Sequence, residues 1–312
     1  MSERTPDASA GVPEGVKSPD PKLLDAPETP RLLDTPASPP LLAAPVLPPV
    51  VKFTGVSKTY DDGYTAIRDI NFTIDDNPNH MEIVGVLGPS GCGKSTVLRL
   101  IAGLTPQYPA TTGTVEVMGK PVTGPGPDRG FVFQDYTSFD NRSVIDNIAF
   151  GLECQGMATA ERYEHAREWI GKVGLSVDRD QFKYPHQLSG GMRQRVALAR
   201  TLILKPRVIL MDEPFGALDP RTRYAMQDLL VALAHEVQAT VFLVTHSIEE
   251  AVYVADRLHI FSSAPGTILK EMPVPPPDRP ALVMQREPEF IRTVFEVRDL
   301  IETLETSTKA GD

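Results

Sequence analysis

A glycine-rich stretch, GPSGCGKST at 88–96, carries the clearest chemical signal in the chain. It fits the spacing G-x-x-x-x-G-K-[ST], in which glycines let the backbone curl so that successive N–H groups point at phosphate oxygens. In such a loop the lysine reaches the outer phosphates, the first hydroxyl is a ligand for Mg²⁺, and the next hydroxyl can bond a phosphate. We therefore predict a nucleotide phosphate site formed by Gly88, Pro89, Ser90, Gly91, Cys92, Gly93, Lys94, Ser95 and Thr96.

Cys92, inside this loop, has two interpretations. In the simpler one it is a small residue with a passive role. In the other, the start of the following helix makes its thiol more acidic than usual. Reagents that block thiols would then inhibit the protein, and bound nucleotide would protect it.

Two adjacent acidic residues end the apolar run VILMDEP at 208–214. Neighbouring side chains on a strand face opposite ways, but a bend at the strand end can bring both to one site. Asp212 then fits the role of a Mg²⁺ partner, directly or through water. Glu213 fits the role of a general base that polarises the water attacking a γ-phosphate.

His246 follows the next apolar run, at 240–245. A single histidine is more often structural than catalytic, but at the end of a neighbouring strand it can contact a γ-phosphate or orient Glu213. We predict Lys94, Glu213 and His246 as the catalytic group.

A second glycine pair occurs in LSGGMRQR at 188–195. Ser189 can cap a helix that starts at Gly190, and the bare backbone of Gly190 and Gly191 allows an anion to approach the helix N-terminus. A plain capped helix is the alternative interpretation. One nucleotide site does not need two such helix starts, so this motif raises the question of a second chain.

The hydrophobic pattern predicts the elements that position these residues. Alternating residues at 51–60 and 66–74 indicate antiparallel strands, and continuous apolar runs at 81–88, 207–212 and 240–245 indicate buried strands. Helical spacing covers 95–104, much of 137–185 and the C-terminal run PEFIRTVFEVRDLIETL, whose apolar face is Phe290, Val294, Val297, Ile301 and Leu304. The predicted fold class is α/β, with a P-loop NTPase core, an antiparallel β subdomain and an inserted α-helical subdomain.

Three regions follow from this pattern. Residues 1–50 hold 12 of the 30 prolines and no aromatic residue, so we predict a disordered proline-rich tail. Its near-repeats LLDAPETP, LLDTPASP and LLAAP are either low-complexity sequence or docking motifs used several times. We assign 51–275 to one nucleotide-binding domain with a helical insertion at about 137–188, and 276–312 to a C-terminal helical extension.

Taken together, these motifs resemble those of the ATP-binding cassette ATPases. GPSGCGKST, the glutamine in FVFQD, LSGGMRQR, VILMDEP, ALD at 217–219 and VTHS occur in that family's order, over roughly 51–274. The resemblance implies ATP and Mg²⁺ as cofactors, adenine stacking on Tyr60 with Tyr64 as a substitute, and Gln134 as a sensor of Mg²⁺ and nucleotide. It also implies a partner cassette: each ATP lies between one phosphate loop and the partner's Ser189, Gly190 and Gly191, and Asp219 crosses to the partner site.

The family resemblance further implies permease subunits in the membrane, with an external solute-binding protein as an indirect partner. DEPFGALDPRTR and VTHSIEEAVYVADR look most like the nitrate, sulfonate and taurine importers, which places the chain at the cytoplasmic face of the cell membrane as a peripheral subunit. An exporter ATPase and a soluble non-transport cassette are the alternatives. In place of the apolar residues common after Gln134 in that subfamily, the chain reads DYTSFDNRSVIDN, where Ser138, Asp140, Asn141 and Arg142 indicate either a more polar partner surface or ordinary surface drift.

The composition of the chain restricts which partners and which cellular compartment we expect. A net charge of −10 disfavours nucleic acid as a partner, and the 41% apolar residues suffice for a core. Two cysteines indicate a reducing compartment rather than a disulfide framework. We find neither a secretory signal pattern nor an apolar run long enough to span a bilayer.

Overall fold

The computed structural model describes residues 47–76, 81–135 and 137–310 of the chain. The tail predicted at 1–50, with its near-repeats, therefore lies almost entirely outside the described residues. Val50 belongs to the fold, because its side chain is buried and its amide donates a hydrogen bond to the Ile74 carbonyl. Val50 thus packs with the residues of the predicted domain, although it lies just before the predicted boundary.

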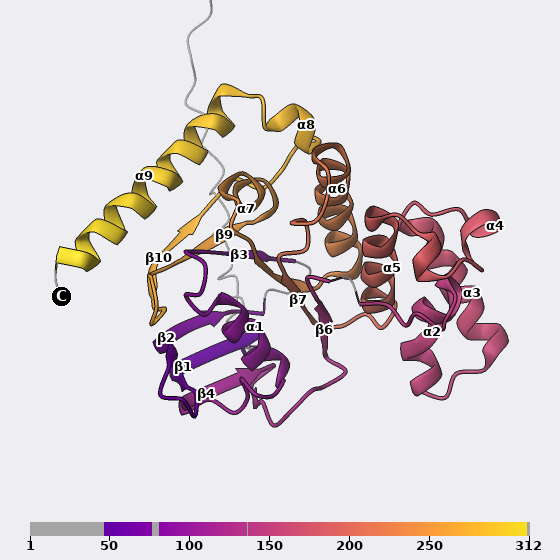
Figure 1. Ribbon diagram of the computed structural model, residues 1–312, viewed down its shortest axis with the longest axis horizontal. Helices are drawn as coiled ribbons and strands as arrows, with labels where there is room; N and C mark the ends of the chain where they lie inside the picture. Colours follow the sequence, from indigo (N-terminus) through magenta and orange to yellow (C-terminus); the bar gives the residue numbers. More distant parts are fainter. Residues whose placement is uncertain (1–46, 77–80, 136, 311–312) are drawn as a thin grey trace, which may run out of the picture. The chain divides into compact units, whose positions relative to one another are not determined.

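A six-stranded sheet carries the predicted buried strands, in the order β10-β9-β3-β8-β7-β6 (Figure 1). Its first five strands along the chain pair in parallel, and only the last is antiparallel. The strands are β3 (Ile83–Leu87), β6 (Arg129–Val132), β7 (Val208–Asp212), β8 (Thr240–Val244), β9 (Arg257–Phe261) and β10 (Ile268–Pro273). Every residue of β3, β7 and β8 is buried, as the continuous apolar runs predicted.

Two hydrophobic cores lie on the opposite faces of this sheet, because successive side chains of a strand alternate. Val84 and Val86 of β3 face the core shared with the antiparallel sheet and α1 (Lys94–Ala102), whereas Ile83 and Leu87 face the core shared with the larger helices. Both faces are therefore covered, and the carboxyl ends of β3, β7 and β8 share one edge. That edge carries the phosphate loop, Asp212 and the residues after Val244.

The antiparallel sheet predicted at the start of the fold has four strands in the order β2-β1-β4-β5. Phe53 and Phe72 pair across it with stacked rings 4.6 Å apart, one side-chain contact that joins two of its strands. The strands are β1 (Val51–Thr59), β2 (Thr65–Ile74), β4 (Thr112–Val117) and β5 (Lys120–Pro121).

The helices of the insertion run from Val144 to Gln187 and form the magenta and rose group at the right of Figure 1. Buried Trp169 and Ile170 join them to the core on which α5 (Gly190–Leu202), the helix that starts at the second glycine pair, also packs. The insertion comprises α2 (Val144–Cys154), α3 (Thr159–Lys172), α4 (Val177–Asp180) and the short 3₁₀ helix η1 (Pro185–Gln187).

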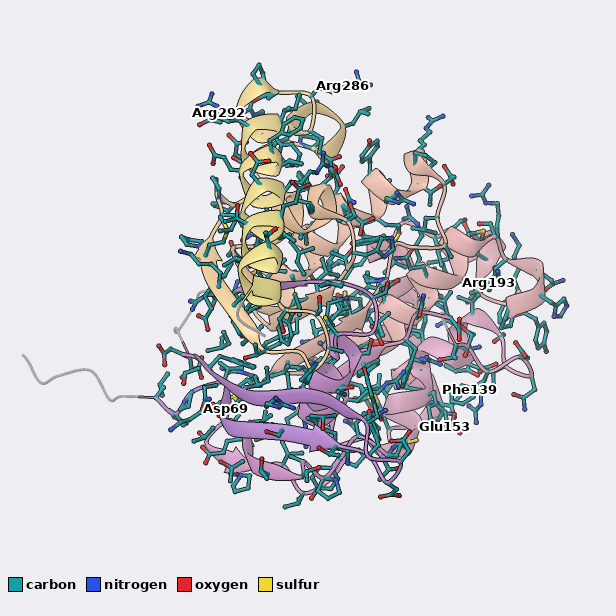
Figure 2. All side chains as sticks on the ribbon, turned by 60° about the vertical axis from the view of Figure 1, so that its left-hand side comes forward. Asp69, Phe139, Glu153, Arg193, Arg286 and Arg292 are labelled. Atoms are coloured by element: carbon teal, nitrogen blue, oxygen red, sulfur yellow. The ribbon has the colours of Figure 1, made fainter. Side chains whose placement is uncertain are left out.

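The C-terminal helices cover the helix-bearing side of the parallel sheet. Phe290, Val294 and Val297 of α9 (Pro288–Ala310) are buried, which confirms the inner part of the predicted apolar face. Arg286 and Arg292 mark the outer side of this region in Figure 2. The other elements are α6 (Pro220–Val237), α7 (Ile248–Val254) and α8 (Ala281–Met284). No helix among the described residues is both long enough and apolar enough to span a membrane.

His259, on β9, gives the fold a pH dependence that can be measured. Its side chain is 1% exposed, and its Nε2 has no hydrogen-bond partner among the described residues. Burial, with a smaller effect from Arg257, lowers its pKa to about 4. It packs edge-on against Phe72, and the Glu271 carboxylate lies 3.8 Å from Nε2. The folded protein therefore resists protonating a group that the unfolded chain protonates near its ordinary pKa of 6.5.

We expect the His259 contribution to stability to be complete above pH 6.5 and lost as the pH falls to 4. The loss reaches about 3 kcal/mol, since each unit of pKa difference corresponds to about 1.4 kcal/mol. Urea unfolding between pH 7.5 and 4.5 measures it. His259→Leu should flatten the pH dependence, whereas the exposed control His235→Gln should keep it. Equal slopes in the two variants would contradict this expectation.

Candidate nucleotide site

The phosphate loop lies between β3 and α1, as predicted. Gly93 caps α1 with a φ of 93°, and a Cβ atom there would lie 2.7 Å from the Ala66 carbonyl oxygen. Only glycine adopts that conformation in that space without strain. The helix N-terminus therefore opens directly onto the loop, where its free N–H groups favour an anion.

Lys94 extends back over this loop and is 6% exposed. Its Nζ donates hydrogen bonds to the carbonyl oxygens of Gly88 at 2.7 Å and Pro89 at 2.9 Å. These bonds hold the ammonium group beside the concave side of the loop. A phosphate oxygen that enters the loop meets a cation already in place.

Cys92 is only 1% exposed, so its thiol lies under the loop. Burial raises the pKa of this thiol, and the opposing effect of nearby Lys94 is smaller. The alternative interpretation, an unusually acidic thiol, is therefore wrong, because loss of solvent outweighs the nearby positive charge. The passive interpretation of Cys92 fits the structure.

Ser95 and Asp212 meet at the base of the loop. The Ser95 hydroxyl donates a 2.8 Å hydrogen bond to Asp212 Oδ1, although 117 residues separate them. Burial raises the pKa of the Asp212 carboxyl, while this hydrogen bond opposes the rise. A hydroxyl and a buried carboxylate are hard oxygen donors of the kind that Mg²⁺ prefers, so the residues present fit a magnesium ion.

Glu213 occupies a left-handed backbone conformation with a φ of 47°, which is uncommon for a residue other than glycine. Its amide donates a hydrogen bond to the Val244 carbonyl at 2.9 Å, and this contact with the end of β8 holds the bend. The predicted bend at the strand end is thus present directly after Asp212, and a shared site for Asp212 and Glu213 stays a prediction. Strain of this kind costs about 1–3 kcal/mol and is concentrated at functional sites.

Two residues from separate segments meet at the Glu213 carboxylate. His246 Nδ1 lies 3.3 Å and Gln134 Nε2 lies 3.5 Å from Glu213 Oε2. The His246 side chain is 62% exposed and that of Glu213 is 25% exposed, so both are accessible from solvent. This arrangement can orient one carboxylate oxygen and leave the other free for a water molecule.

A pocket of about 290 Å³ extends from Glu213 across the loop to Tyr60 and Tyr64. The two tyrosine rings are nearly parallel, with centroids 6.4 Å apart. The hydroxyl of Tyr60 lies 3.3 Å from Thr96 Oγ1, and that of Tyr64 donates to the Gly91 carbonyl at 3.0 Å. Both tyrosines therefore remain candidates for contact with the adenine base of a nucleotide.

The remaining predicted site residues lie at the starts of α5 and α6 and do not line this pocket. Ser189 caps α5 by accepting a hydrogen bond from the Met192 amide, and Asp219 caps α6. A Cβ atom on Gly191 would lie 2.7 Å from the side chain of Thr222, so the two helix starts are close together. Gly190 has open space at the same position.

A second cavity, of about 520 Å³, lies between the β6 region and helices α2 and α5. Its large side chains are mainly aromatic, and sequence analysis missed it because they come from three separate segments. They are Phe131, Phe133, Phe139, Phe150, Arg129, Arg200 and Leu204. We call this cavity the aromatic groove.

Phe139 lines the aromatic groove and is partly exposed to solvent. It is labelled near Glu153 in Figure 2. Arg142 lies over the rings of Phe139 and Phe150 and pairs with Glu153 at 2.8 Å. Buried Asn147 fixes this segment through hydrogen bonds with both the amide and the carbonyl of Phe139. The groove itself is lined largely by aromatic rings, with Arg142 over two of them and paired with a carboxylate. Asp140 and Asn141 are exposed beside it, so a more polar partner surface stays a prediction, with ordinary surface drift as its alternative.

Known proteins with similar sequences show which family this chain belongs to. Residues 67–216 match the family model described as ABC transporter. The nitrate import ATP-binding protein of Synechocystis is 44% identical over 248 residues, which are 77% of this chain and 90% of that protein. The chain belongs to the ABC transporter family. It is an ATPase cassette that binds and hydrolyses ATP.

Further ABC proteins agree with this membership. The taurine import ATP-binding protein of Escherichia coli K12 is 46% identical over 221 residues, which are 70% of this chain and 83% of that protein. A solved dimer of the ATP-binding cassette MJ0796, in a post-hydrolysis state bound to ADP and Pi, is 32% identical with a TM-score of 0.62. It covers 72% of this chain and 99% of its own. The predicted ABC ATPase fold is confirmed.

Proposed function

We propose that this cassette energises a membrane importer of small solutes of the nitrate, sulfonate or taurine kind and works as a pair of cassettes at the cytoplasmic face of the membrane. The single observation that carries the proposal is the meeting of Glu213, His246 and Gln134 beside a complete phosphate loop. The solute class rests on relatives named for nitrate and taurine import, at 44% and 46% identity. Permease subunits and an external solute-binding protein complete the proposed assembly.

In the proposed reaction, the loop and Lys94 hold the phosphates of ATP, and the helix N-terminus of α1 faces their negative charge. Ser95, Asp212 and Gln134 would hold Mg²⁺, which neutralises phosphate charge when bound. The Glu213 carboxylate accepts a hydrogen bond from the attacking water and then takes the proton of that water as general base. His246 orients the Glu213 carboxylate, and in the complex it contacts the γ-phosphate.

The second glycine helix serves a partner cassette in this proposal. Ser189, Gly190 and Gly191 do not line the pocket of their own chain, so their helix N-terminus is free to face the nucleotide of another. Asp219 begins the neighbouring helix and would reach the same interface. ATP then joins two chains through its γ-phosphate, and hydrolysis removes that contact.

Tyr60 is proposed to stack on the adenine ring. We expect Tyr60→Ala to weaken ATP binding about tenfold, because stacking of a base on an aromatic ring contributes about 1–3 kcal/mol. Tyr60→Phe keeps the ring and should bind nearly as well as the wild type. Titration with ATP measures the effect. A larger loss in Tyr64→Ala than in Tyr60→Ala would transfer the stacking role to Tyr64.

The aromatic groove is proposed to receive a short coupling helix of the permease. Its aromatic walls suit apolar side chains, and a groove of this size can hold one turn of a helix with its anchors. In this way the permease would contact the helical insertion and the β6 region together. Gln134 follows β6 closely, so movement at the groove would reach the nucleotide site.

Phe139→Asp tests this contact. We expect the change to reduce permease-dependent ATP hydrolysis about tenfold or more, because it places a charge in an apolar interface. The measurement compares the cassette with and without its co-expressed permease in lipid nanodiscs. Phe182→Asp is the matched control, since Phe182 is 66% exposed on the insertion and lies outside the groove. Equal effects of the two substitutions would refute the groove assignment.

A further inference from the structure

The two residues that flank His246 are each held by a different glutamate. The Thr245 hydroxyl donates a 2.6 Å hydrogen bond to Glu250 Oε2 and accepts one from the Ser247 amide at 3.1 Å. The Ser247 hydroxyl bonds Glu249 at 3.1 Å and also caps α7. Side chains of α7 therefore contact both residues that flank His246, and only the Thr245 contact involves a buried glutamate.

The two glutamates differ sharply in burial. Glu250 is 6% exposed, and its other oxygen lies 3.4 Å from Arg223 Nε on α6. Glu249 pairs with Arg298 of α9 at 3.2 Å, but the two side chains are 47% and 42% exposed. An exposed pair of this kind has little influence on geometry or stability, whereas a buried pair constrains both partners.

Arg223 extends the buried contact to the start of α6. Its Nη2 donates a 3.0 Å hydrogen bond to the carbonyl of Leu218. Leu218 belongs to the ALD loop, residues 217–219, whose Asp219 begins α6. One continuous chain of contacts thus runs from the ALD loop through Arg223, Glu250 and Thr245 to His246.

This chain of contacts is costly to build. A carboxylate loses its hydration when it is buried, and burial raises the pKa of Glu250 despite the Thr245 hydrogen bond and the charge of Arg223. Buried ion pairs seldom increase stability over apolar packing, so their gain is geometric. Here the buried Glu250 fixes the position of Thr245, the residue before His246.

We propose that Glu250 is a positioning residue for His246 and that, with Arg223, it links the ALD loop to His246. The inference rests on the proposed function, in which the ALD loop meets the partner cassette. Engagement of one nucleotide site would then alter the position of His246 in the same chain. The two ATP sites would hydrolyse cooperatively through this link.

The test compares Glu250→Gln with Glu249→Gln in the full chain, by steady-state ATP hydrolysis over a range of ATP concentrations. Glu250→Gln should lower kcat about tenfold, because small misplacements of a catalytic group are costly, while KM stays within about twofold. The Hill coefficient should fall towards about 1, since the coupling between sites is lost. Glu249→Gln, which changes the exposed neighbour, should match the wild type in all three quantities.

Arg223→Gln breaks the other end of the link at a half-buried side chain and provides a second test that does not remove the buried carboxylate. It should reproduce the loss of kcat, and the double variant with Glu250→Gln should lose no more than either single variant. NMR spectra of the histidine rings give a readout independent of turnover. The His246 signal should shift in Glu250→Gln and Arg223→Gln but not in Glu249→Gln.

A purely structural role predicts different results. Glu250→Gln would then lower kcat by the same factor in a His246→Ala background, or would act no differently from Glu249→Gln, and either result overturns the link. If Glu250→Gln has no further effect in that background, the link is supported. A wild-type rate in His246→Ala alone would overturn the proposed site and the link with it.

Discussion

Glu213→Gln should reduce ATP turnover about 100-fold or more, because the amide cannot take the proton of the attacking water. The substitution keeps the shape of the side chain and its neighbours His246 and Gln134. ATP binding should therefore persist, and the uncleaved γ-phosphate should hold two chains together. Steady-state hydrolysis measures the first effect, and size-exclusion chromatography in ATP measures the second.

Glu236→Gln provides the control for this experiment, since Glu236 is an exposed glutamate of α6 that pairs only with Lys172 among the described residues. It should hydrolyse ATP at the wild-type rate and remain a monomer when ATP is exhausted. Turnover by Glu213→Gln within about threefold of the wild type would exclude Glu213 as the base, given the usual contribution of such a group. Loss of turnover without any ATP-bound dimer would instead question the paired arrangement.

Lys94→Ala should have the second large effect, on binding and on hydrolysis together. The Lys94 ammonium is held by two loop carbonyls, so it is in place before any phosphate arrives. A hydrogen bond to a charged group contributes about 1.5–3 kcal/mol, which corresponds to about 10- to 100-fold in ATP affinity. Removal of a preorganised cation should also lower turnover about 100-fold.

Isothermal titration with ATP and steady-state hydrolysis together check the Lys94 prediction. At one fixed ATP concentration, ATP should also raise the melting temperature of Lys94→Ala less than that of the wild type, because stabilisation by a ligand falls as its Kd rises. Lys52→Ala is the control, since Lys52 lies exposed on β1 and outside the pocket. Equal ATP affinity in Lys94→Ala and the wild type would show that the loop binds phosphate through its backbone alone.

Much of the nucleotide site could be predicted from short stretches of sequence, because the residues within each stretch determine its local conformation. The phosphate loop is nine consecutive residues, and its glycines and its position between strand and helix determine its shape locally. The helix caps at Ser189 and Asp219 are equally local, since a cap needs only the next three residues. Continuous apolar runs identified β3, β7 and β8 for the same reason.

Contacts between distant segments were decided only by the tertiary structure. The sheet order β10-β9-β3-β8-β7-β6 separates strands that are neighbours in the chain and joins strands that are far apart in it. For that reason Ser95 meets Asp212 across 117 residues and Gln134 meets Glu213 across 79. Glu213 also needs the end of β8 to hold its left-handed bend, and nothing in the local sequence specifies that contact.

The aromatic groove and the Thr245–Glu250–Arg223 link also depend on contacts between distant segments, which local sequence does not specify. DYTSFDNRSVIDN is polar in composition, yet Asn147 folds it so that Phe139 faces other aromatic rings. Glu249 and Glu250 are the same residue type side by side, and only the packing of α6 and α9 makes one buried and the other exposed. Local chemistry and family membership could be predicted from the sequence, because both depend on residue types and their spacing. The tertiary structure decided burial and partners, because these depend on which elements pack together.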